Sequence, residues 1–202
     1  MVSIVKNSTP ILVISIKKRS QVHTYAMYSS VNTKPCNLVL LVGLKGSGKT
    51  FTGAVLEKYL DIKFLRIEPI FLEILQQEPE LAGIPLEQRG FQIVLEKLDE
   101  LAQSHSTLCI ESTGTAHTFP ELLAALHQGF RIFIIHVKAP LDTCIERIMT
   151  RDASAHIPVS NHRLKEINEC ALLVNLPWDL EIDNSQFQDE VAIAESVLKK
   201  LR

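Results

Sequence analysis

Eight consecutive residues, Gly43–Thr50, read GLKGSGKT and fit the pattern GxxxxGK(S/T). The glycines let successive backbone N–H groups turn inward to form a concave anion site, and a following helix would present its positive end there. Lys49 adds a positive charge at the β- and γ-phosphates of a nucleotide, and the Thr50 hydroxyl can bind Mg²⁺. This phosphate-binding loop, the P-loop, predicts a nucleotide site made by Gly43, Leu44, Lys45, Gly46, Ser47, Gly48, Lys49 and Thr50.

A carboxylate follows an apolar run farther along the chain. Glu111 comes directly after residues 108–110 and before the small-residue turn 112–114. A P-loop protein usually places an acidic residue at the end of a neighbouring strand, where it positions Mg²⁺ or its water. The sequence therefore predicts Thr50 and Glu111 as the metal site. The alternative is an acidic residue that faces solvent or caps the next helix.

Two arginines, Arg147 and Arg151, stand four residues apart in a helical pattern that precedes a polar segment. This spacing puts both side chains on one face of the helix. Directed toward the P-loop, they would neutralise charge on a transferring phosphoryl group and on the nucleotide. The polar segment 152–161 would then close over the site as a lid. The alternative is a solvated face whose arginines pair with Glu146 or Asp152.

A further polar turn follows the last expected strand. Asn184 stands in this turn, directly after Asp183. We predict that it lies beside the base of the nucleotide. An ordinary Asx turn is the alternative interpretation.

The elements that must position these residues alternate along the chain from Asn37 onward. Apolar runs of strand length are separated by segments of helical period, which implies parallel crossovers and an α/β fold, a three-layer sandwich. The expected strands are 38–42, 62–67, 107–110, 131–137 and 180–182. The expected helices are 50–60, 70–77, 86–103, 119–127, 141–151, 162–173 and 189–201.

Composition excludes several classes of protein. The chain has 202 residues, 46% hydrophobic and 22% charged, which argues against wholesale disorder. A net charge of -2 and 6% aromatic residues give no general reason to bind nucleic acid or an anionic membrane. No apolar run approaches the roughly 18 residues of a membrane span. Four cysteines without a CxxC pair predict reduced thiols and a cytoplasmic protein.

The first 36 residues differ from the rest of the chain. They contain five basic residues and no acidic residue, so they carry +5 while the remainder carries -7. They are rich in Ser, Thr, Asn and Lys and show no helical period. We expect an appendage to a domain at 37–202. It is a flexible tail or an early translation start, an extra edge strand through Ile11–Ile16, or an organelle-targeting leader.

From about Asn37 to Arg202 the chain resembles the small P-loop kinases of the shikimate, gluconate and nucleoside-monophosphate kinase type. The P-loop, the order of elements, the two arginines before a lid-like segment and the Asp-Asn turn carry this resemblance. It implies a P-loop NTPase fold with a five-stranded parallel sheet of order 2-3-1-4-5. It also implies ATP and Mg²⁺ as cofactors and transfer of the γ-phosphoryl group to a small acceptor. Lys49, Arg147 and Arg151 would be the catalytic residues.

Three positions depart from the shikimate kinase pattern. The Asp-x-Asp after strand two is here 66–68, Arg-Ile-Glu, and the glycine triplet after strand three is 112–114, Ser-Thr-Gly. The acceptor-binding Phe-Arg pair appears as 91–92, Phe-Gln, so a bidentate carboxylate clamp is missing at that place. Arg66 and Arg89 are candidates to replace it.

Glu68 and Gly114 remain the residues expected at the acceptor site. Two function classes follow from these patterns. The first is an ATP-dependent small-molecule kinase that is a monomer or a weak dimer. The second is a nucleotide-binding or slowly hydrolysing protein that serves as a switch for a partner and has no small-molecule acceptor.

Overall fold

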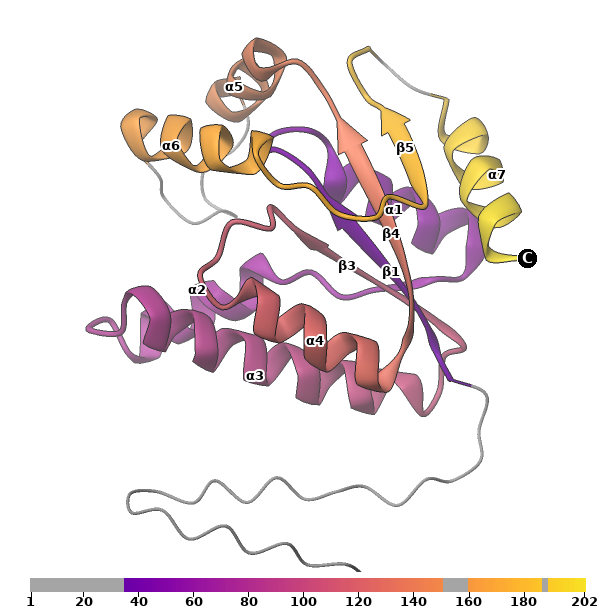
Figure 1. Cartoon of the computed structure of the whole chain (residues 1–202), viewed down its shortest axis with the longest axis horizontal. Coiled ribbons are helices and arrows are strands. Elements are labelled where there is room, and N and C mark those ends of the chain that lie inside the picture. Colours follow the sequence, from indigo (N-terminus) through magenta and orange to yellow (C-terminus); the bar gives the residue numbers. More distant parts are fainter. Residues whose placement is uncertain (1–34, 151–159, 187–188) are drawn as a thin grey trace, which may run out of the picture. The chain divides into compact units, whose positions relative to one another are not determined.

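A computed structural model describes residues 35–150, 160–186 and 189–202 of the chain (Figure 1). Arg151, most of the expected lid and nearly all of the expected appendage lie outside the described residues. All helices and strands within the described residues belong to one compact unit, Lys34–Arg202.

The centre of this unit is a sheet of five strands whose pairings are all parallel. Their order is β2-β3-β1-β4-β5, as predicted. Pairing brings Val42 of β1 level with Ser112 of β3, so the two strands end at the same edge of the sheet. The strands are β1 (Asn37–Val42), β2 (Lys63–Phe64), β3 (Thr107–Ser112), β4 (Arg131–Lys138) and β5 (Leu180–Asp183).

Helices cover both faces of the sheet. Because successive side chains of β1 point to opposite faces, this strand contacts both layers of helices. Leu38 and Leu40 pack with α2, α3 and α4, whereas Val39 and Leu41 pack with α1 and α7. The predicted three-layer α/β sandwich is thereby confirmed (Figure 1). The helices are α1 (Lys49–Leu60), α2 (Glu68–Gln77), α3 (Gly83–Ala102), α4 (Phe119–Gly129), α5 (Leu141–Thr150), α6 (Asn161–Leu172) and α7 (Glu190–Leu201).

The second strand is shorter than the predicted 62–67. As an edge strand, β2 pairs only with β3, through Lys63 and Phe64. The chain then turns away, because Ile67 is buried in the core and α2 begins at Glu68, two residues earlier than expected. Pro69 fits this first turn, where a missing N–H costs nothing. Glu68 therefore lies at a helix N-terminus and not beyond a long strand.

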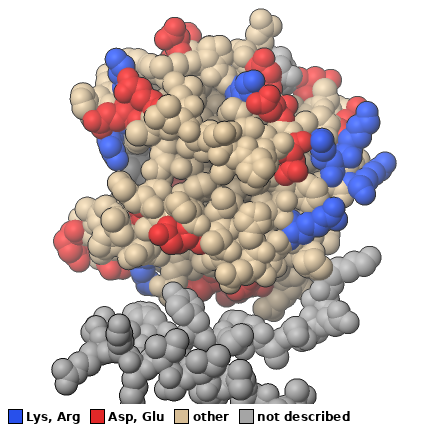
Figure 2. All heavy atoms as spheres, in the orientation of Figure 1, with Lys and Arg blue, Asp and Glu red and all other residues tan. Residues whose placement is uncertain are grey.

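Charged side chains are spread over the surface. Figure 2 shows acidic and basic residues mixed on the visible face, with neither sign covering it. No helix within the described ranges is long and apolar enough to cross a membrane.

Candidate functional site

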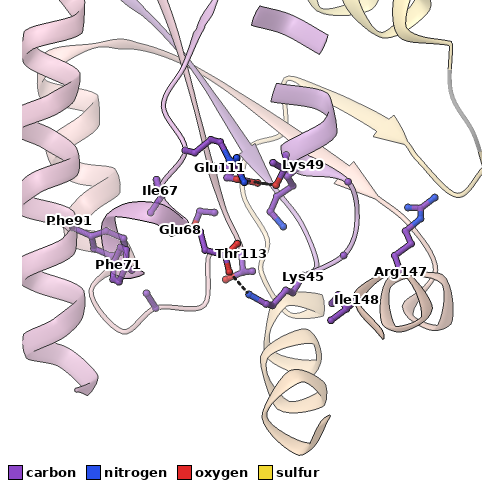
Figure 3. A pocket seen from close by; sticks show the side chains of 16 residues that line it. Lys45, Lys49, Ile67, Glu68, Phe71, Phe91, Glu111, Thr113, Arg147 and Ile148 are labelled. Atoms are coloured by element: carbon purple, nitrogen blue, oxygen red, sulfur yellow. Dashed lines mark hydrogen bonds and ion pairs between the residues drawn. The ribbon is translucent and has the colours of Figure 1, made fainter. Parts of the chain in front are cut away.

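A cavity of about 500 Å³ opens where β1 and β3 end (Figure 3). Strand order reverses at β1, since β3 lies on one side and β4 on the other, and such crevices bind ligands in open α/β sheets. Sixteen residues line it: Lys45, Gly46, Gly48, Lys49, Thr50, Arg66, Ile67, Glu68, Phe71, Phe91, Glu111, Ser112, Thr113, Ala116, Arg147 and Ile148.

Two glycines of the P-loop adopt backbone conformations that other residues rarely reach. Gly46 has φ 92° and Gly48 has φ 97°. A Cβ at Gly46 would collide with the carbonyl group of Cys144, and one at Gly48 would collide with the amide of Asn184. The loop can therefore keep this shape against its neighbours only with glycine at both positions.

The Lys49 side chain is buried within the P-loop. Its Nζ donates hydrogen bonds to the carbonyl oxygens of Gly43, at 2.9 Å, and Leu44, at 2.7 Å. Burial lowers the pKa of Lys49 from 10.5 to about 8, although the nearby Glu111 carboxylate favours the charged form. An anion in the cavity would compensate this desolvated charge, which makes the position suitable for phosphate.

The two predicted metal residues, Thr50 of α1 and Glu111 of β3, lie in contact. The Thr50 hydroxyl donates to the Glu111 carboxylate, at 2.8 Å to Oε2 and 3.1 Å to Oε1. Oxygen atoms of this kind suit Mg²⁺, which is usually held by one or two protein ligands, the phosphates and water. The described residues contain no group of three or more His, Cys, Asp or Glu able to hold a metal. The donor set thus fits Mg²⁺ bound together with a nucleotide.

Two buried asparagines support the P-loop backbone from distant parts of the chain. Asn168 of α6 pairs with Lys45, whose N–H donates to Oδ1 at 2.8 Å and whose carbonyl oxygen accepts from Nδ2 at 3.1 Å. Asn184 donates from Nδ2 to the carbonyl oxygen of Ser47 at 2.8 Å. Its predicted contact with a base remains a prediction. The Asx turn at this place is made by Asp183, whose Oδ1 accepts from the Ser185 N–H.

Arg147 extends from α5 on the side of the P-loop away from Phe71 and Phe91 (Figure 3). Its Nη2 donates to the carbonyl oxygen of Asn184 at 2.9 Å, while its Nη1 is buried and has no hydrogen-bond partner. Arg147 therefore lies against the turn after β5 and also lines the cavity. Its predicted partner Arg151 lies outside the described residues.

The opposite end of the cavity, which we call the acceptor end, comprises Arg66, Glu68, Phe71, Phe91 and Thr113. The Lys45 ammonium lies 3.2 Å from Oε1 of Glu68 and so joins the P-loop to this end. The rings of Phe71 and Phe91 meet edge to face, with centroids 5.8 Å apart.

Only one of the two arginines that could replace the missing carboxylate clamp lies at the cavity. Arg66 lines the cavity. Arg89 does not line it, and its Nε lies 3.8 Å from Oε1 of Glu78. Gly114, expected at the acceptor site, also lies off the cavity wall; it has φ 75° and packs near Val174. Its neighbour Thr113 lines the cavity instead.

Sequence reasoning missed Asn168. A signal was present, because Leu164, Asn168 and Ala171 recur at i, i+4 and i+7, the spacing of a buried helix face. A polar residue on such a stripe needs an internal hydrogen-bond partner. Phe71 was missed because an aromatic residue on an amphipathic helix is usually part of the core.

A family model and two shikimate kinases match the sequence of this chain. A family model described as "AAA domain" matches residues 38–171. A shikimate kinase from Prochlorococcus marinus strain MIT 9211 is 31% identical over 159 residues, which are 76% of this chain and 78% of that protein. A shikimate kinase from strain NATL2A is 32% identical over 119 residues, or 58% and 56% of the two chains.

Solved structures share the fold. A putative kinase from Chloroflexus aurantiacus superposes with a TM-score of 0.63 at 19% identity, covering 84% of this chain and 100% of that one. A shikimate kinase from Aquifex aeolicus superposes with a TM-score of 0.55 at 18% identity, covering 81% and 95%.

Proposed function

Because this chain belongs to the small P-loop kinase family, we propose that it transfers the γ-phosphoryl group of ATP to a hydroxyl group of a small-molecule acceptor. One observation carries the proposal. A single cavity joins Lys49 and the Thr50–Glu111 pair to Glu68, Arg66 and the two phenylalanines. A nucleotide-binding switch needs only the first of these two ends, whereas a kinase needs both.

The P-loop, Glu111 and Arg147 form the other end of the cavity, which we call the phosphate end. These residues can perform the charge neutralisation that phosphoryl transfer requires. Lys49 and the backbone N–H groups of the P-loop would hold the β- and γ-phosphates, and Thr50 and Glu111 would hold Mg²⁺. When bound, Mg²⁺ supplies positive charge to the phosphate oxygens. Arg147 would add charge on the nucleotide side of the P-loop.

Glu68 is placed to orient the acceptor. In the proposed step, a bond forms between the acceptor oxygen and the γ-phosphorus while the bond from that phosphorus to ADP breaks. The acceptor's hydroxyl proton passes to the Glu68 carboxylate. Glu111 is less suited to this role, because it lies beside Thr50, where the two residues would hold Mg²⁺.

The side chains of the acceptor end indicate which chemical groups an acceptor would carry. Phe71 and Phe91 offer apolar ring surface, and Arg66 offers a guanidinium group that suits a carboxylate or phosphate. We therefore propose an acceptor with a hydroxyl group, a small apolar face and an anionic group.

The test is ADP release from Mg²⁺-ATP in the presence of a panel of hydroxylated carboxylates, sugar phosphates, neutral polyols and nucleosides. We expect stimulation by an anionic hydroxylated compound and no stimulation in the Lys49→Ala variant. Arg66→Ala should raise the acceptor KM about 10-fold or more and leave the ATP KM unchanged. Arg89→Ala is the matched control and should change neither. An ADP release that no member of the panel stimulates would support the switch function instead.

A further inference from the structure

We propose that Asn168 is a positioning residue that holds the P-loop in its phosphate-binding shape. The proposal rests on the proposed function, since it concerns how the same nucleotide site is built. Asn168 lies 123 residues from Lys45 in the sequence, and its side-chain amide makes two hydrogen bonds to the Lys45 backbone. It therefore ties the nucleotide end of the cavity to α6.

The contact has two points. The side-chain amide of Asn168 accepts from the Lys45 N–H at 2.8 Å and donates to the Lys45 carbonyl at 3.1 Å. An amide that presents one donor and one acceptor matches the backbone of a single residue, as a neighbouring strand would. Both backbone groups of Lys45 are thereby directed toward α6.

Burial makes this pairing obligatory. Asn168 has 0% exposure, so the loss of Lys45 as a partner would leave its amide unsatisfied, which is unfavourable. The apolar residues on either side of the contact are buried too, because Leu44 packs with Cys144 of α5 and Ala171 of α6. Water therefore has little access to replace the asparagine.

The position of Lys45 matters for both ends of the cavity. Its backbone precedes Gly46, the first of the two left-handed glycines, and its ammonium reaches Glu68. A shift of the Lys45 backbone would move the N–H groups that follow it in the loop. It would also displace the Lys45 side chain and therefore its ammonium group. Asn168 thus acts on the phosphates through Lys45 and does not touch them.

The experiment compares Asn168→Ala and Asn168→Leu with the wild-type chain. Leucine has the same number and branching of side-chain heavy atoms and cannot form these hydrogen bonds, so it keeps the test valid if the alanine variant folds poorly. Lys165→Ala is the control, because Lys165 is an exposed polar residue on the same helix and lies outside the segment 152–161. Calorimetry measures the Kd for AMPPNP in the presence of Mg²⁺. Hydrogen exchange measures the protection of the Lys45 amide.

We expect both Asn168 variants to raise the Kd about 10- to 100-fold, the size expected for two neutral hydrogen bonds. The Lys45 amide should exchange faster in both, and Lys165→Ala should change neither quantity. A purely structural role would lower Tm and leave Kd and Lys45 exchange unchanged in the folded protein, and this result would overturn the proposal.

The same measurements distinguish failure of the proposed function from failure of the proposal about Asn168. Wild-type chain that binds no nucleotide, with a Lys45 amide that still loses protection in the variants, contradicts the proposed function and supports the asparagine contact. Wild-type chain that binds nucleotide, with Asn168 variants that bind it equally well, supports the function and overturns the contact.

Discussion

The two ends of the cavity are built in different ways. The loop of the phosphate end is one continuous segment, Gly43–Thr50, whose backbone is held by two buried asparagines, and Glu111 and Arg147 join it from elsewhere in the chain. The acceptor end collects side chains from the turn before α2, from α2 and α3, and from the turn after β3. The first end is mostly backbone with fixed partners, whereas the second is mostly side chains.

This difference follows from what each end must recognise. Phosphates are the same in every reaction of a P-loop kinase, so a rigid loop with prearranged N–H groups and charges serves them well. Acceptors differ, and side chains such as Arg66 and Phe71 can change without disturbing the sheet. We therefore expect substitutions at the phosphate end to affect catalysis with every acceptor, and substitutions at the acceptor end to affect the choice of acceptor.

The largest effect is expected for Lys49→Ala. It removes the charge held inside the P-loop, so phosphoryl transfer should fall by about 1000-fold or more and Mg²⁺-ATP should bind more weakly. Circular dichroism should show the same fold. Equal affinity of wild type and variant for Mg²⁺-ATP in calorimetry would contradict the assignment of the phosphate end.

Arg147→Ala should have the next largest effect, together with Arg151→Ala. If these arginines approach the phosphoryl group in the transition state, each substitution should lower kcat by about 10- to 1000-fold and weaken ATP binding less. Steady-state kinetics measures both values. The control is Arg163→Ala, an exposed arginine on α6 that pairs with Glu166. Kinetics that match this control would make the two arginines surface charges.

Glu111→Gln tests the metal assignment. The glutamine oxygen can still accept from Thr50, so the fold should persist, but the negative charge that attracts Mg²⁺ is lost. We expect the Mg²⁺ concentration for half-maximal activity to rise about 10- to 100-fold. The exposed Glu100→Gln should leave it unchanged, and an unchanged value in Glu111→Gln as well would remove Glu111 from the site.

Nucleotide binding should also depend on pH through Lys49. Burial lowers its pKa to about 8, so the attractive charged form prevails at pH 7 and falls to about a tenth of the molecules at pH 9. The Kd for Mg²⁺-ATP should therefore rise about 10-fold between these two pH values. The residual binding of Lys49→Ala should lack this rise. A wild-type affinity that stays level to pH 9 would mean that Lys49 keeps its proton.

The smallest effect is expected for removal of residues 1–34. A chain that begins at residue 35 should bind nucleotide as the full chain does, and its free energy of unfolding should stay within about 1 kcal/mol. The composition of residues 1–36 motivates this prediction. Urea unfolding of the two chains measures the difference, and a much larger loss would indicate an extra packed strand.

The amino-acid sequence alone determined the phosphate chemistry and the fold class. The P-loop could be recognised because its residues are contiguous, and each of its roles depends on residue type at a set spacing. The alternation of apolar runs with helical periods predicted a parallel sheet, since only long crossovers can join parallel strands. Strand ends were less certain, and β2 was predicted too long because an apolar run does not reveal where an edge strand leaves its single neighbour.

Tertiary structure alone decided which distant side chains meet the loop. Asn168 and Arg66 look like ordinary polar residues in the sequence, and Arg66 could not be distinguished from Arg89. Packing brings Asn168 to Lys45 and places Arg66, but not Arg89, on the cavity wall. The physical reason is that such contacts depend on how helices lie on the sheet, and no local spacing records that arrangement.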